Sequence, residues 1–147
     1  MTHPSLYIKS QPVLLFNAPE YSCRIKNLFL LRIWLHPDFT CFNLGYQATS
    51  YYIRGGWVNI SQHTQLLSTA SKNPLQLLSA ENIPYAPHHH HFEAHTDWLY
   101  FRLFFEAIPY RDQTLEMLEN NLANEDDFDI SNIKLTLKDG CEVVDLT

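Results

Sequence analysis

Trp98-Leu-Tyr-Phe-Arg-Leu-Phe-Phe-Glu106 is the stretch that decides the fold class. Its large apolar side chains recur at every second position, and the polar residues Arg102 and Glu106 fall between them. Successive side chains of a β-strand point to opposite faces, so this alternation predicts a strand with one buried face. The residues predicted to point inward are Leu99, Phe101, Leu103 and Phe105.

The same two-residue period recurs along the chain between breaks marked by proline and glycine. Strands are predicted over residues 13–16, 22–35, 40–52, 57–61, 75–79, 98–107, 114–119 and 129–137. Short strands without long helical periods predict an all-β, immunoglobulin-like antiparallel β-sandwich of about seven to nine strands. One alternative stays open, because residues 114–122 also fit a short helix capped by Asp112.

The longest predicted strand, over residues 22–35, has an apolar face that is interrupted at Asn27, where we expect a bulge. The residues of that face are Cys23, Ile25, Phe29, Leu31, Ile33 and Leu35. The outward face of the same strand is predicted to carry Arg24, Lys26, Arg32 and Trp34.

A single domain is predicted for residues 1–147, since this length is ordinary for one domain and allows a sizeable core. Residues 1–20 are predicted to form an N-terminal arm and residues 138–147 a C-terminal tail. The formal net charge of −6 is uneven, because residues 93–147 hold thirteen acidic and only four basic groups. Such an acidic region repels phosphate backbones, so we expect no nucleic-acid partner.

Three cysteines, Cys23, Cys41 and Cys141, are widely spaced and form no C-x-x-C pair, which does not favour a zinc ribbon or a dithiol redox motif. Cys23 and Cys41 are expected to act as small buried hydrophobes, and a bridge between them stays open in an oxidising compartment. The first residues do not resemble a secretory leader, and the longest apolar run, 28–35, is too short to cross a bilayer. We therefore expect no membrane insertion and a cytoplasmic location, or an extracytoplasmic one if the N-terminus was trimmed.

Several short segments form a recognisable order within residues 24–137. They are Trp57-Val-Asn-Ile-Ser61, Thr64-Gln-Leu66, Asn82-Ile-Pro84, Phe101-Arg-Leu-Phe-Phe105 with Ile108-Pro109, Met117-Leu-Glu119 and Asn132-Ile-Lys-Leu135. Together they resemble a small β-sandwich accessory domain of Bacteroidetes proteins, whose function is uncharacterised. The resemblance implies a sandwich that accompanies other domains, and it implies no catalytic residues. The chain departs from the pattern at Ser71-Lys-Asn-Pro74, where a Gly-Lys turn is expected.

Histidines cluster in Pro87-His-His-His-His-Phe-Glu-Ala-His95. If this segment is extended, every second side chain shares one face, and imidazoles at that spacing can bind zinc, nickel or copper. The predicted metal ligands are His89, His91, Glu93 and His95. The other interpretation is a solvated polar loop between two strands, which the position of the segment favours.

Aromatic and basic residues gather on predicted outward faces. Tryptophan, tyrosine and arginine together are typical of protein interfaces. The predicted interface residues are Trp34, Trp98, Tyr100, Arg102 and Phe104. The alternative is that the N-terminal segment, with Leu6, Tyr7 and Ile8, folds back and covers them.

The sequence contains no P-loop and no G-x-S-x-G elbow. We therefore expect a non-catalytic protein-interaction or structural module, which needs no cofactor and binds another protein or a second copy of itself. Two alternatives stay open. One is a metal-binding protein that uses residues 88–95, and the other is a carbohydrate-binding module in which Trp34 or Trp98 stacks on sugar rings.

Overall fold

The computed structural model describes residues 12–119, 126–138 and 141–144, and these contain twelve β-strands and no helix. The strands are β1 (Val13–Asn17), β2 (Glu20–Cys23), β3 (Leu28–His36), β4 (Phe39–Gln47), β5 (Trp57–Val58), β6 (Gln65–Ser68), β7 (Leu75–Glu81), β8 (His90–His91), β9 (Trp98–Phe105), β10 (Gln113–Leu118), β11 (Ile130–Leu135) and β12 (Cys141–Val144). The all-β prediction is confirmed, and the strand number exceeds the predicted seven to nine.

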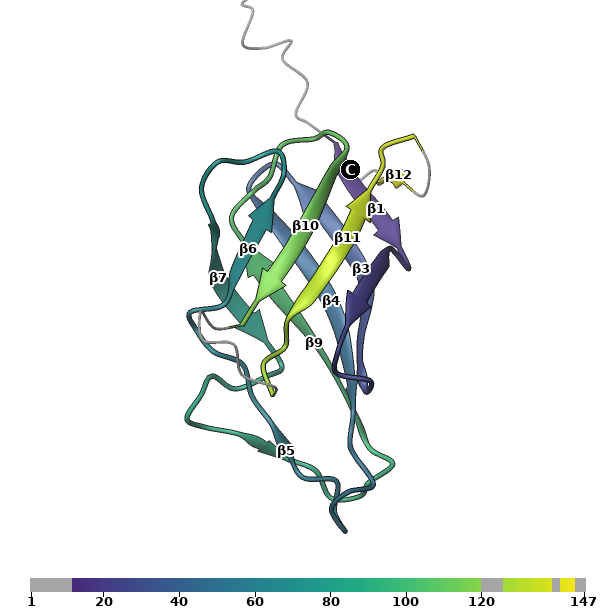
Figure 1. Ribbon diagram of the computed structural model, residues 1–147, viewed down its shortest axis with the longest axis vertical. Coiled ribbons are helices and arrows are strands. Elements are labelled where there is room, and N and C mark those ends of the chain that lie inside the picture. The colour runs from purple at the N-terminus through teal and green to yellow at the C-terminus, as the bar shows by residue number, and fades with distance from the viewer. Residues whose placement is uncertain (1–11, 120–125, 139–140, 145–147) are drawn as a thin grey trace, which may run out of the picture.

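Ten of these strands form one antiparallel sheet in the order β12-β1-β3-β4-β9-β7-β6-β10-β11-β2. The sheet curls, so that β6, β10 and β11 lie in front of β3, β4 and β9 in Figure 1. The turn of the curl is at β7, which pairs with β9 on one side and through only two residues with β6 on the other. β5 and β8 form a separate two-stranded sheet at one end of the molecule (Figure 1).

The core fills the space between the two halves of the curled sheet. Four inward side chains of β9 are buried, as the alternation predicts, and Leu103 and Phe105 have no exposed surface. They pack in one cluster with residues of the other half, including Leu115, Met117 and Ile130. Burial of these apolar side chains is the main force that holds the curled sheet closed.

The predicted strand over residues 22–35 is wrong in two respects. It is divided into β2 and β3, so Arg24 and Lys26 lie in the connection between strands. The bulge lies between Leu30 and Arg32, not at Asn27. A bulge reverses which residues face inward, so Leu28 and Leu30 are buried before it, and Phe29 and Leu31 lie on the outward face.

Other boundaries also differ from the predictions. The strand predicted over 40–52 ends at Gln47, and that predicted over 57–61 is reduced to β5 and an isolated bridge at Ile60. Residues 113–118 are the strand β10, so the helix alternative is wrong there; residues 120–122 lie outside the described residues. The sequence analysis missed β6, β8 and β12.

Strand β12 pairs with β1 at one edge of the sheet, with Val13 opposite Val144. Parts of the predicted arm and tail therefore meet in the sheet. No helix in the described residues is long and apolar enough to span a bilayer.

Candidate interaction surface

The outward side of β3, β4 and β9, which we call the outer face, brings together residues from three strands. Its members are Phe29, Leu31, Arg32, Trp34, Cys41, Asn43, Gly45, Trp98, Tyr100, Arg102 and Phe104. The register of the strands places them in rows that run across the sheet, because residues paired across an antiparallel ladder point the same way.

The central row is polar. Asn43 on β4 is paired with Arg32 on β3 and with Arg102 on β9. The Nη2 atom of Arg102 lies 2.6 Å from the Oε2 atom of Glu81 on β7, and its guanidinium is 5.7 Å from the ring centre of Phe104. The side chain of Arg32 has no hydrogen-bond or ion-pair partner within the part of the chain that the structure describes. The row therefore places one guanidinium group on each side of the Asn43 amide.

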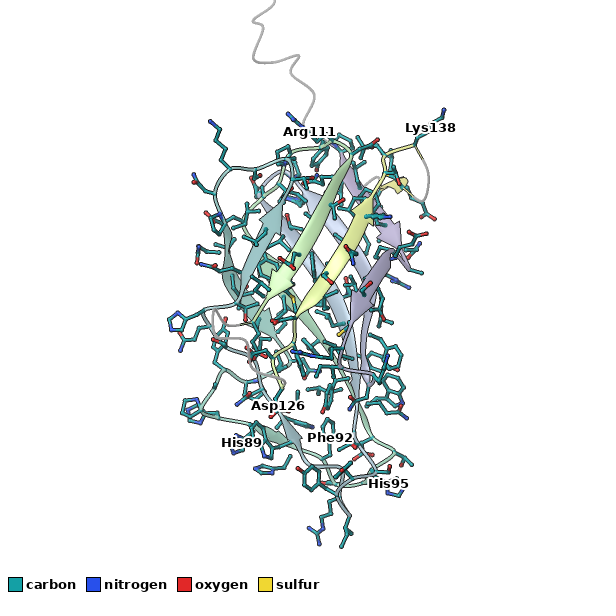
Figure 2. All side chains as sticks on the ribbon, viewed as in Figure 1. His89, Phe92, His95, Arg111, Asp126 and Lys138 are labelled. Atoms are coloured by element: carbon teal, nitrogen blue, oxygen red, sulfur yellow. The ribbon has the colours of Figure 1, made fainter. Side chains whose placement is uncertain are left out.

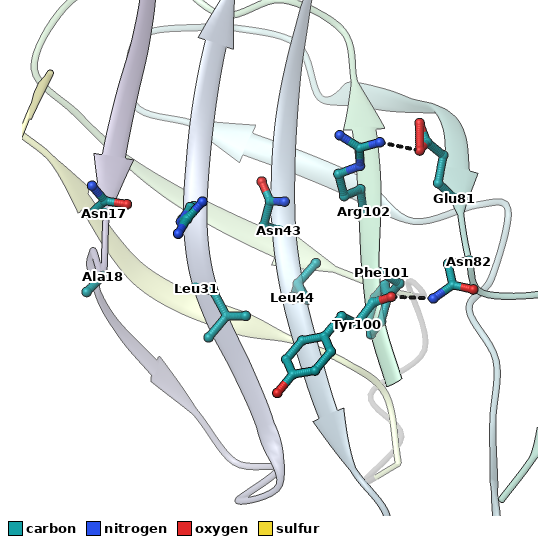
Figure 3. A pocket seen from close by; sticks show the side chains of 11 residues that line it. Asn17, Ala18, Leu31, Asn43, Leu44, Glu81, Asn82, Tyr100, Phe101 and Arg102 are labelled. Atoms are coloured by element: carbon teal, nitrogen blue, oxygen red, sulfur yellow. Dashed lines mark hydrogen bonds and ion pairs between the residues drawn. The ribbon is translucent and has the colours of Figure 1, made fainter. Parts of the chain in front are cut away.

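This row lines a groove of about 650 Å³ that runs over β1, β3, β4, β9 and β7 (Figure 3). Asn17 and Ala18 line one end of it, and Glu81 and Asn82 line the other. The Oδ1 atom of Asn43 is buried in the groove and accepts no hydrogen bond. Most buried polar atoms are hydrogen-bonded, so this unpartnered oxygen is an exception.

On one side of the polar row the groove has an aromatic wall. The Tyr100 ring lies across β4 and turns its face outward (Figure 3). This position depends on Gly45, because a Cβ atom there would lie 3.1 Å from the Tyr100 ring. The ring of Trp98 is parallel to that of Tyr100 within 4°. Asn82 holds this part of β9 in place, since its Nδ2 atom donates to the Tyr100 carbonyl oxygen at 2.6 Å.

On the other side of the row lies a second apolar group. Trp34, Cys41 and Phe104 are neighbours across three strands. Cys41 is buried, and burial raises the pKa of its thiol to about 11. A thiol with this pKa stays protonated near neutral pH and is a poor nucleophile. Cys41 thus acts as a small hydrophobe under the outer face, as predicted.

All five predicted interface residues lie on the outer face. Trp98 is 40% exposed and Tyr100 is 58% exposed, and Arg102 is exposed as well. Trp34 and Phe104 are half-buried. The alternative that Leu6, Tyr7 and Ile8 cover these side chains concerns residues outside those described. The sequence analysis did not recognise Leu31, Asn43 or Glu81 as part of the surface.

The predicted metal ligands lie at the far end of the molecule: His89 just before β8, His91 in it, and Glu93 and His95 after it. The imidazole rings of His89 and His91 are 5.1 Å apart, and His89 also stacks on Trp57. His89 and His95 are well separated on either side of Phe92 (Figure 2). Within the described ranges, no three His, Cys, Asp or Glu residues are grouped so that they could hold a metal ion. The structure brings two of the four predicted ligands together, and Glu93 and His95 do not join them.

A buried carboxylate, that of Glu119, follows β10. Its Oε2 atom accepts a hydrogen bond from the Ser61 amide at 3.0 Å, and its Oε1 atom accepts one from the Phe128 amide at 2.8 Å. Burial raises the pKa of Glu119 to about 7, although the two amide hydrogen bonds act in the opposite direction. The side chain fastens two loops to the end of β10, and we assign it a structural role.

No protein-family model, curated protein or solved structure matches this chain. The geometry and chemistry of the outer face are therefore the features that bear on function.

Proposed function

We propose that this protein is a non-catalytic interaction module that binds another protein, or a second copy of itself, through the outer face. The strongest support is that aromatic and basic residues from two separate segments of the sequence meet on one surface. Trp34 from one segment and four residues of β9 from another lie on one side of one sheet, and the aromatic rings of Trp98 and Tyr100 are exposed. Tryptophan, tyrosine and arginine carry much of the binding energy of protein interfaces.

A sheet surface that binds no partner is expected to have a different residue composition. Antiparallel sheets with one solvated side normally carry polar residues there. The exposed rings beside the two arginines leave apolar surface in contact with water. A partner that covers these rings gains the free energy of burying that surface. The proposal includes an immunoglobulin-like arrangement of the strands and kinship with the Bacteroidetes accessory domain. The resembling segments that support it overlap β5, β6, β9, β10 and β11, and Asn82-Ile-Pro84 and Ile108-Pro109 lie in connections between strands.

One observation favours a second candidate, a carbohydrate-binding module. The rings of Trp98 and Tyr100 are parallel and exposed, and the C–H face of a sugar can stack on such an aromatic ring. A metal-binding function is favoured less. Zinc sites use at least three protein ligands, and the described residues contain no group of three; of the four predicted ligands, His89 and His91 are the two with neighbouring rings.

Site-specific photo-cross-linking tests the leading proposal in the cells that produce the protein. Benzoylphenylalanine replaces Leu31 on the outer face, and in a matched control it replaces Lys134 on β11. We expect protein adducts from the first position, loss of these adducts on adding Trp98→Ala and Tyr100→Ala, and no effect on adding Ile53→Ala at a distant exposed position. Equal adducts from both positions would contradict the proposal, as would turnover of a small substrate by the purified protein.

A further inference from the structure

We propose that the groove on the outer face recognises an extended acidic peptide segment of the partner, in which a carboxylate side chain lies between two apolar ones. This inference rests on the proposed function and specifies the chemistry of the partner. Two features of the outer face carry it: the two arginines that line the groove, and the order of the apolar and polar rows along β9.

The charge of the groove selects an anion. Arg32 and Arg102 flank Asn43, and Glu81 neutralises only one of them. The side chain of Arg32 is exposed and has no partner among the described residues. A guanidinium binds a carboxylate through two parallel hydrogen bonds, which are stronger than hydrogen bonds between neutral groups. A carboxylate above the central row would supply the partner that Arg32 lacks.

The spacing of the rows favours a peptide. Tyr100, Arg102 and Phe104 stand two residues apart along β9, and so form apolar, cationic and apolar rows about 6.7 Å apart. An extended peptide that runs along β9 has the same two-residue period. It would present apolar, acidic and apolar side chains to the three rows in turn. The partner motif is thus an apolar residue, any residue, Asp or Glu, any residue and a second apolar residue.

Titration of the full chain with defined probes tests this inference, with the indole signal of Trp98 in an NMR spectrum as the readout. The probe is an acetylated and amidated nonapeptide, Gly-Ser-Leu-Ser-Glu-Ser-Leu-Ser-Gly, and its matched forms carry Gln or Lys in place of Glu. We expect the Glu peptide to bind about tenfold more tightly than the Gln peptide, because hydrogen bonds to charged groups are the stronger ones. The Lys peptide should not bind.

Variants of the protein test whether Arg32 is responsible for the preference for the Glu peptide over the Gln peptide. Arg32→Ala should remove the preference for Glu over Gln, and Arg32→Lys should restore part of it, because lysine keeps the charge and loses the paired hydrogen bonds. Arg111→Ala, an exposed arginine in another part of the molecule, is the control and should retain the full preference. Raising the salt concentration should weaken only the Glu peptide.

The outcomes separate the two proposals. Equal binding of the Glu and Gln peptides, or no binding of either, would overturn the acidic-motif inference and leave the cross-linking result as it stands. Binding of tri-galacturonate with no peptide binding would overturn both proposals, because it would show that the groove recognises a carbohydrate. Cross-links that survive the loss of Trp98 and Tyr100 would overturn the proposed function, and the acidic-motif inference with it, even if the Glu peptide binds.

Discussion

The two outward sides of the curled sheet differ in composition, although both consist of strands whose side chains alternate between the core and the outside. The outer face of β3, β4 and β9 exposes Trp98, Tyr100 and two arginines. The outward side of β10 and β11, which we call the opposite face, carries Thr114, Glu116 and Lys134, and Thr114 is paired with Lys134. The opposite face is an ordinary solvated sheet surface, so the aromatic composition of the outer face is a property of that site and not of the fold.

The largest expected effect separates inward from outward residues on one strand. Leu103→Ala removes a side chain with no exposed surface, and should lower the free energy of unfolding by about 4 kcal/mol through lost burial and a cavity. Tyr100→Ala on the same strand should lower it by less than about 1 kcal/mol. Urea denaturation measures both. Similar losses for the two variants would mean that Tyr100 is part of the core.

Two glutamates at β10 provide the second comparison. Glu119 has a pKa of about 7 when folded, raised by burial from 4.5, so its ionisation costs stability as pH rises through this interval. Below about pH 4.5 the side chain is neutral in both states, and the cost is absent. Relative to Glu119→Gln, the wild-type free energy of unfolding should therefore fall by on the order of 3 kcal/mol between pH 4.5 and pH 8.

Glu116→Gln on the opposite face is the control for this pH effect, since its side chain is only half-buried. Denaturation curves at several pH values measure all three proteins. A difference between wild type and Glu119→Gln that stays constant with pH would show that Glu119 is not held in the buried environment described above.

A substitution that changes no charge tests the role of the Tyr100 ring beside the groove. Gly45→Ala places a methyl group 3.1 Å from the Tyr100 ring and should displace the ring from β4. We expect partner cross-linking at the Leu31 position to fall about tenfold, with a change in unfolding free energy of at most about 1 kcal/mol, because alanine is favoured over glycine within a strand. Ser131→Ala on the opposite face should change neither quantity. Unchanged cross-linking in Gly45→Ala would show that the position of the ring does not matter.

The smallest expected effect concerns the ion pair between Arg102 and Glu81. Both side chains are about half-exposed, and such pairs contribute little because water screens them. Glu81→Gln should lower the free energy of unfolding by about 0.5 kcal/mol or less. The same variant frees Arg102 and should strengthen binding of the Glu peptide. Weaker binding would mean that Glu81 positions the guanidinium rather than competing for it.

Local alternation made the strands β9, β10 and β11 predictable, because each has one buried and one exposed side. It failed at β3, where the bulge between Leu30 and Arg32 reverses the pattern and moves Phe29 and Leu31 outward. Strands of two to four residues, such as β8 and β12, are too short to show a period.

The candidate site was predictable only in part for a related reason. The aromatic residues and Arg102 stand out along β9, within one segment of sequence. The role of Asn43 depends on its two neighbours, Arg32 and Arg102, which lie on other strands and are brought beside it by the order of the sheet. Pairing between distant segments leaves no local pattern in the sequence, so the unsatisfied oxygen at the centre of the groove appears only in three dimensions.

The pairing of β1 with β12 has a consequence for the order of folding. Val13 lies opposite Val144, so forming this edge closes a loop of nearly the whole described chain. Closing so large a loop has a high entropic cost unless the intervening strands have already assembled. We therefore expect folding to start among neighbouring strands such as β3 and β4, and the edge formed by β12 to be added late. In hydrogen exchange, the amides of β12 should open before those of β4 and β9, while the outer face stays intact.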